Sequence, residues 1–69
     1  MDTLGQQVRA RRRSLSLLQS DVADLAQVSE RFVREVEHDK PTLRLDKLSA
    51  VLAVLGLRLT TELRPGEPR

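Results

Sequence analysis

The chain has 69 residues, no cysteine and a formal net charge of +2 at pH 7. A chain of this length forms at most one small domain, and dimerisation often supplies the apolar burial that such a domain lacks. The absence of cysteine excludes disulfides and thiolate chemistry and fits a reducing cytoplasm. No signal peptide is recognisable, and no segment approaches the roughly 20 apolar residues of a membrane span. We therefore expect a small cytoplasmic protein without membrane segments.

The charge is unevenly distributed along the chain. Arginines crowd the first segment, the middle third leans acidic, and the last third is basic again. Such a distribution indicates either a solvated face or a surface that binds phosphate, and charge alone leaves both open. Phe32 is the only aromatic residue, so the core must consist of Leu, Val and Ala, which is a helical composition.

Helical spacing predicts the first two elements. Over residues 4–15, Leu4, Val8, Arg12 and Leu15 share one stripe, and Thr3 is placed to cap that helix. A second helix is expected within residues 17–27. Its common face consists of Val22, Ala23 and Ala26, whose alanines let another helix approach closely.

Two further helices follow. Ser29 is placed to cap a third helix that ends near His38 and turns Val33 and Val36 inward. Residues 38–42 form a loop, because Pro41 disfavours helical angles at the residue before it. A fourth helix is predicted over residues 43–55, and Gly56 ends it. Its inward repeat is Leu45, Leu48, Val51, Leu52 and Leu55.

The spacing changes after Gly56. Leu57, Leu59, Thr61 and Leu63 alternate with polar residues in the two-residue period of a strand. Because a lone strand has no ladder partner, we expect it to pair with the same strand of a second subunit. An extended fourth helix or a loose tail is the alternative. The expected organisation is a helical domain over residues 1–56, a dimerisation strand over 57–64 and a disordered tail over 65–69.

Two short helices, Gln19 to Ala26 and Glu30 to His38, joined by a tight turn, form a helix-turn-helix. Such a unit presents its second helix to the major groove of double-stranded DNA, where arginine binds guanine and glutamate accepts from cytosine. A solvated, salt-bridged face is the alternative. The outward, base-reading set is Glu30, Arg31, Arg34 and Glu35.

The carboxylates of this face are expected to pair with its arginines. Glu30 and Arg34, and likewise Arg31 and Glu35, are four positions apart, a spacing that brings side chains together on a helix. Because the paired face then contributes little net attraction, affinity must come from phosphate contacts. The residues expected at the phosphate backbone are Gln19, Ser29, Phe32, His38, Lys40, Arg44 and Arg13.

The stretch "LGQQVRARRRSLSLLQSDVADLAQVSERFVREVEHDKPT" resembles the helix-turn-helix of the Xre and phage-repressor superfamily. The superfamily pattern has a helix-one arginine, a "TQxxLA" start, a "VS" turn and an "IE-GK" close. The stretch "FVREVEHDKPTLRLDKLSAVLAVLGLRL" is similar to small HipB-like antitoxins, whose last strand joins two subunits. The resemblance implies an all-α, four-helix lambda-repressor-like domain with a short C-terminal β-strand that pairs across a homodimer.

Position by position, the resemblance assigns base reading to the outward residues of the third helix. It also implies that Gln19 contacts phosphate and base, and that Arg12 and Glu37 form a structural pair between the first and third helices. Loss of one partner of a buried pair costs about 3–5 kcal/mol. Three positions depart from the pattern, where threonine, glycine and glycine are usual: Leu18, Gln27 and Asp39.

The resemblance implies a sequence-specific DNA-binding repressor that binds a palindromic operator as a homodimer. It further implies an antitoxin that regulates its own operon and neutralises a HipA-like kinase toxin. A stand-alone Xre-type regulator without a toxin is the alternative, and a module that has lost DNA binding is a third. We expect no enzyme activity, cofactor or metal, since the single histidine, His38, lies at a helix end without an evident nucleophile or metal partner.

Overall fold

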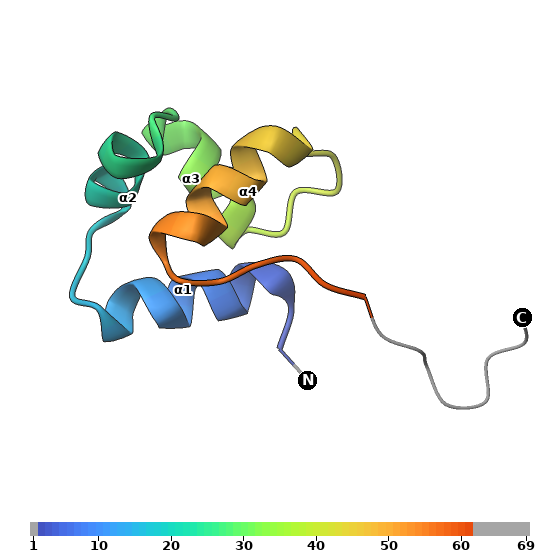
Figure 1. Ribbon diagram of the computed structural model, residues 1–69, viewed down its shortest axis with the longest axis horizontal. Helices are drawn as coiled ribbons and strands as arrows, with labels where there is room; N and C mark the ends of the chain where they lie inside the picture. The colour runs from blue at the N-terminus through green and yellow to red at the C-terminus, as the bar shows by residue number, and fades with distance from the viewer. Residues whose placement is uncertain (1, 62–69) are drawn as a thin grey trace, which may run out of the picture.

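The computed structural model describes residues 2–61, and within that range the chain is all-helical (Figure 1). It contains the helices α1 (Leu4–Ser14), α2 (Gln19–Ala26), α3 (Glu30–Glu37) and α4 (Leu45–Val54). This confirms the predicted all-α architecture of four helices. The fourth helix begins two residues later than expected, because Leu43 and Arg44 still belong to the connection from α3.

Polar side chains begin two of these helices. The Thr3 Oγ1 accepts from the Gln6 N–H at 3.1 Å, and the Gln6 side chain accepts from the Thr3 N–H at 2.8 Å, which completes a capping box at α1. At α3, the Ser29 hydroxyl accepts from the Phe32 N–H. Leu18 precedes α2 without a side-chain acceptor, so this helix lacks a side-chain cap, although the Leu18 N–H donates to Asp21 at 2.7 Å.

Each helix is followed, within two positions, by a residue with left-handed backbone angles. These residues are Ser16, Gln27, Asp39 and Gly56, with φ between 57° and 72°. After each, the next N–H donates to a carbonyl five residues earlier (17 to 12, 28 to 23, 40 to 35, 57 to 52) at 2.8–3.1 Å, the pattern of a Schellman motif. Of these four residues only Gly56 lacks a Cβ, so Gln27 has left-handed angles at a position where the family pattern has glycine, at a cost of about 1–2 kcal/mol.

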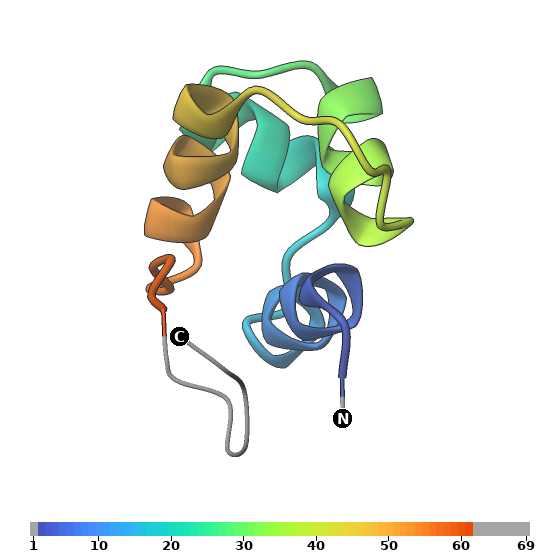
Figure 2. The same cartoon turned by 90° about the vertical axis from the view of Figure 1, so that its right-hand side faces the viewer.

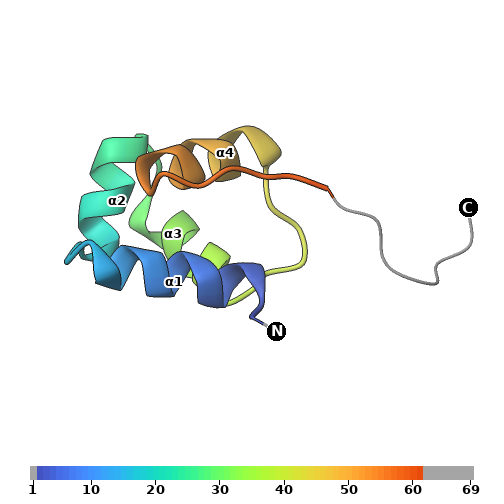
Figure 3. The same cartoon turned by 60° about the horizontal axis from the view of Figure 1, so that its bottom comes forward.

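The helices enclose one core. α2 packs against both α3 and α4, and α1 packs against α3. Figure 1 shows α1 along one side of the domain and the other three helices on the opposite side, and Figure 2 shows α3 and α4 on the two sides above α1, which is seen almost end-on. Figure 3 shows the same arrangement from a third direction. The buried apolar side chains are Val8, Val22, Ala23, Phe32, Val33, Val36, Leu48, Val51, Leu52 and Leu55.

Two residues expected on inward stripes do not lie there. Leu45 is 64% exposed, and Leu15 is 40% exposed. Leu45 is the first residue of α4 and Leu15 the residue after α1. Both therefore extend past the region that neighbouring helices cover, so correct helical spacing does not bury them.

The segment after α4 forms no strand within residues 57–61, the last part of the chain that the structure describes. Leu57 is half-buried against the core, and its N–H donates to Leu52, so this residue belongs to the end of α4. Leu59 and Thr61 are exposed. Leu63, the end of the expected strand and the expected tail over residues 65–69 lie outside the described residues.

Candidate nucleic-acid interface

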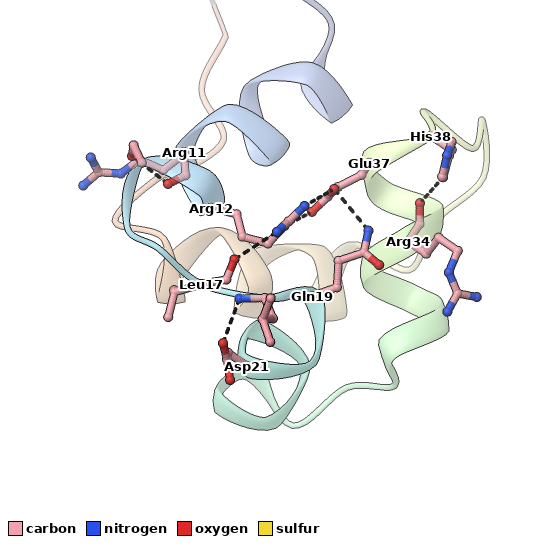
Figure 4. A network of polar contacts seen from close by, with 10 residues as sticks. Arg11, Arg12, Leu17, Gln19, Asp21, Arg34, Glu37 and His38 are labelled. Atoms are coloured by element: carbon pink, nitrogen blue, oxygen red, sulfur yellow. Dashed lines mark hydrogen bonds and ion pairs between the residues drawn. The ribbon is translucent and has the colours of Figure 1, made fainter.

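A buried ion pair joins α1 to α3. The Arg12 Nε–H donates to Glu37 Oε2 at 2.6 Å, and its Nη2 donates to Oε1 at 3.0 Å (Figure 4). Their side chains are only 10% and 3% exposed. The remaining Arg12 amino group donates to the Leu17 carbonyl, and the Gln19 amide donates to Glu37 at 3.2 Å. The structure thus brings together Arg12 and Glu37, which the resemblance pairs, and ties α2 to the same carboxylate.

The ion pair shifts the pKa of both partners. The hydrogen bond to Glu37 raises the pKa of the Arg12 guanidinium, although burial by itself would lower it. Burial by itself would raise the pKa of Glu37, but the hydrogen bonds from Arg12 and Gln19 outweigh burial and hold that pKa below its ordinary value of 4.5. Both groups therefore stay charged at neutral pH, and the three helices meet at one ionic contact.

A second long-range contact joins the start of α1 to the end of α3. Asp39 accepts from the Thr3 hydroxyl at 2.7 Å and from the Gly5 N–H at 2.8 Å. These two hydrogen bonds lower the pKa of the Asp39 carboxyl. Asp39 is one of the three positions that depart from the family pattern. Its carboxylate binds the N-terminus of α1, a contact that no local sequence signal indicates.

The outward face of α3 carries Glu30, Arg31 and Arg34, all exposed. Arg31 lies 3.4 Å from the Glu35 carboxylate, an ion pair at the predicted spacing. The second predicted pair is wrong, because no ion pair under 4 Å joins Glu30 to Arg34 in residues 2–61. Arg34 lies in the last turn of α3, and its backbone carbonyl contacts His38 Nδ1 at 2.8 Å. One arginine of this face is therefore held by a carboxylate, and the other is free to reach outward.

Glu35 is less exposed than the rest of that face. Its side chain is 25% exposed, against 81% for Arg31. The carboxylate also lies 3.2 Å from Lys40 Nζ, so two cations from different segments share it. This second contact was not predicted, because Lys40 lies beyond the end of the helix. Glu35 thus borders the base-reading face and contacts the connection to α4.

Among the residues expected at the phosphate backbone, Phe32 has a buried side chain. Its ring belongs to the core at 8% exposure, and its N–H is already bound to Ser29. The Phe32 ring therefore shares the inward face of α3 with Val33 and Val36, and the expected contact of Phe32 with the phosphate backbone stays a prediction. The exposed Ser29 hydroxyl accepts one hydrogen bond and keeps its own O–H to donate. Gln19 is partly buried against Glu37, with its amide oxygen free of that contact.

The cations expected at the phosphate backbone are exposed. Arg13 lies in the last turn of α1, and both Lys40 and Arg44 lie in the connection between α3 and α4. Arg44 donates to Asp46 at 2.7 and 3.2 Å, a two-bond contact that holds the pKa of Asp46 below its ordinary value. The imidazole of His38 is exposed beside the same connection.

Within residues 2–61, no helix is long and apolar enough to cross a membrane. The same part of the chain holds no group of three His, Asp or Glu side chains placed to bind a metal ion. The described surface is distinguished instead by the charges of α3 and of the connection that follows it.

A capped helix, held by its inner face on two others and presenting charge outward, defines a helix-turn-helix domain. Comparison with protein families agrees: residues 8–61 match the family described as Helix-turn-helix. The chain belongs to this family, and its sequence-based identification as an Xre-type helix-turn-helix is confirmed. It is also 38% identical over 66 residues to the uncharacterized HTH-type transcriptional regulator y4mF of Sinorhizobium fredii, covering 96% of this chain and 86% of that protein.

Proposed function

We propose that this chain is a sequence-specific DNA-binding transcriptional repressor whose α3 enters the major groove. The main observation that supports the proposal is that α3 has one buried face and one exposed, charged face. Phe32, Val33, Val36 and Glu37 are buried, whereas the opposite face is charged and exposed. A helix fixed in this way has one rigid surface to present, and arginines on it are suited to guanine. The relative in Sinorhizobium fredii, described as a transcriptional regulator, supports the same role.

The proposed roles of individual residues follow from exposure and charge. Arg31 and Arg34 read bases, and Glu30 discriminates by accepting from cytosine or rejecting acceptors. Ser29, Gln19, Lys40, Arg44 and Arg13 contact phosphates, and His38 lies near the backbone. Glu35 is proposed to act at the edge of the reading face. The Arg12–Glu37 pair holds α1, α2 and α3 in register without itself contacting DNA.

The protein is proposed to act as a homodimer. Residues 57–63 alternate Leu and Thr with polar residues, and Leu59 is exposed, which supports pairing with the same segment of a second copy. Two copies of α3 would then enter successive major grooves about 34 Å apart on a palindromic operator. Truncation after Gly56 should yield a monomer that binds DNA weakly. A truncated chain that remains dimeric by light scattering would contradict the role of this segment.

Footprinting on the DNA upstream of its own gene tests the repressor proposal. Arg31→Ala and Arg34→Ala should each reduce preference for the protected site by about 1–3 kcal/mol, the value of a good arginine–guanine contact. Arg9→Ala is the matched control: Arg9 is exposed on α1, so its loss should weaken all sequences alike. Unchanged operator preference in both α3 variants would favour the alternative of a module that does not read DNA.

The proposal extends to a protein partner. The similarity of residues 32–59 to HipB-like antitoxins supports a HipA-like kinase toxin encoded beside this gene, which the chain would neutralise while repressing the operon. Co-expression with the neighbouring reading frame, followed by affinity purification, should recover a complex of the two. If no neighbouring kinase exists and the purified chain still protects its own promoter, the stand-alone regulator is the correct function.

A further inference from the structure

Two of the cations proposed to bind phosphate are already paired with carboxylates in the free chain. Lys40 Nζ lies 3.2 Å from Glu35, and Arg44 makes two contacts with Asp46, at 2.7 and 3.2 Å. Both cations lie in the connection between α3 and α4, whereas one carboxylate belongs to each of the flanking helices. The same arrangement therefore occurs at both ends of this connection.

Such contacts resemble those that a phosphate would make. A carboxylate and a phosphate both offer paired oxygens to the fork of an arginine, and both neutralise a lysine. A phosphate that approaches Lys40 or Arg44 must consequently displace a carboxylate. Because these pairs are largely solvent-exposed, at 46% for Lys40 and 67% for Arg44, each displacement should reduce affinity by only about two- to five-fold.

We infer that Glu35 and Asp46 act as intramolecular counter-ions that compete with DNA phosphates for Lys40 and Arg44. This inference rests on the proposed DNA binding and names residues that regulate its strength. Its main consequence concerns DNA of unrelated sequence, because phosphate contacts supply essentially all of such binding. The two carboxylates therefore weaken the binding of the protein to non-operator DNA.

The test uses the full chain and a fluorescent DNA duplex of mixed sequence, titrated by anisotropy at one low salt concentration. Asp46→Asn removes the counter-ion charge and keeps an oxygen to accept the Lys47 N–H, which Asp46 binds at 2.9 Å. Asp24→Asn is the matched control, since Asp24 is exposed on α2, forms no ion pair in residues 2–61 and changes net charge equally. Circular dichroism of each variant verifies that the helices are retained.

Asp46→Asn should tighten binding about two- to five-fold beyond Asp24→Asn, and Glu35→Gln should do the same. The gain from Asp46→Asn should vanish in an Arg44→Ala background, where there is no cation to release. Equal gains in Asp46→Asn and Asp24→Asn, or a gain that survives Arg44→Ala, would overturn the inference while leaving the proposed DNA binding intact. Failure of the unaltered chain to bind any duplex at low salt would contradict the proposed function as well.

Discussion

Replacement of Glu37 by alanine should destabilise the protein more than any substitution on its charged surface. The change leaves the Arg12 guanidinium buried with only the Leu17 carbonyl as partner. Arginine cannot release its proton at accessible pH, so the charge stays where it is. The helices α1, α2 and α3 would then meet around an unneutralised cation.

Two routes lead to the same magnitude. Glu37 accepts two charge-assisted hydrogen bonds from Arg12, and bonds to charged groups contribute about 1.5–3 kcal/mol each. Removal of one partner from a buried ion pair costs about 3–5 kcal/mol. A chain of this length has a free energy of unfolding of roughly 3–10 kcal/mol. We therefore expect the Glu37→Ala variant to lose about a third or more of its free energy of unfolding, and to lie close to its unfolding midpoint if the unaltered chain is at the low end of that range.

Urea denaturation at pH 7, followed by far-ultraviolet circular dichroism, measures the effect. Glu30→Ala serves as the control, because Glu30 is exposed on the same helix and its loss should cost less than about 1 kcal/mol. A loss below about 1 kcal/mol for Glu37→Ala would refute the reasoning, since it would mean that solvent reaches Arg12 and replaces its partner.

Lowering the pH should affect the intact Arg12–Glu37 pair and the Arg12→Ala variant differently. The pKa of Glu37 lies below its ordinary value of 4.5 in the folded chain, so the pair stabilises fully above about that pH and is lost as the pH falls through the lowered folded pKa. In Arg12→Ala, the stranded carboxyl can take up a proton, so its deficit relative to the unaltered chain should shrink on acidification. A deficit for Arg12→Ala that is constant from pH 7 to below 4.5 would contradict this assignment of charge.

Three further substitutions test the backbone. Gln27→Gly should raise the free energy of unfolding by about 0.5–1 kcal/mol, or several degrees in Tm, because glycine adopts the φ of 57° at this position without strain. A lower Tm would mean that the Gln27 side chain stabilises the turn. Gly5→Ala should lower the free energy of unfolding by about 1–3 kcal/mol, since a Cβ there would lie 2.6 Å from the Glu37 carbonyl oxygen. An unchanged midpoint in urea would show that α1 can shift to make room for the methyl group. Leu18→Thr should raise the free energy of unfolding by about 1 kcal/mol by capping α2, which thermal melts can measure. No gain would mean that the contact between Asp21 and the N–H of residue 18 already stabilises the start of this helix.

Local chemistry in the sequence was sufficient to predict the four helices and most of their ends. Thr3 and Ser29 cap helices where their hydroxyls precede apolar spacing, and Gly56 ends one because a residue without Cβ adopts left-handed angles at little cost. These are interactions between residues three to five positions apart. Such interactions depend only on neighbouring residues, so they can be predicted without knowledge of the rest of the chain.

The partners of side chains depended on the tertiary structure. Helical spacing predicts the direction of Phe32 or Leu45 around an axis, but only the neighbouring helices decide that Phe32 is buried and Leu45 exposed. Asp39 binds the start of α1 across 34 residues, and Lys40 rather than Arg34 joins a carboxylate of α3. The physical reason is that the spacing of apolar residues shows only which side chains share a face of one helix. Burial and ion pairing depend instead on distances between helices, which only the tertiary structure determines.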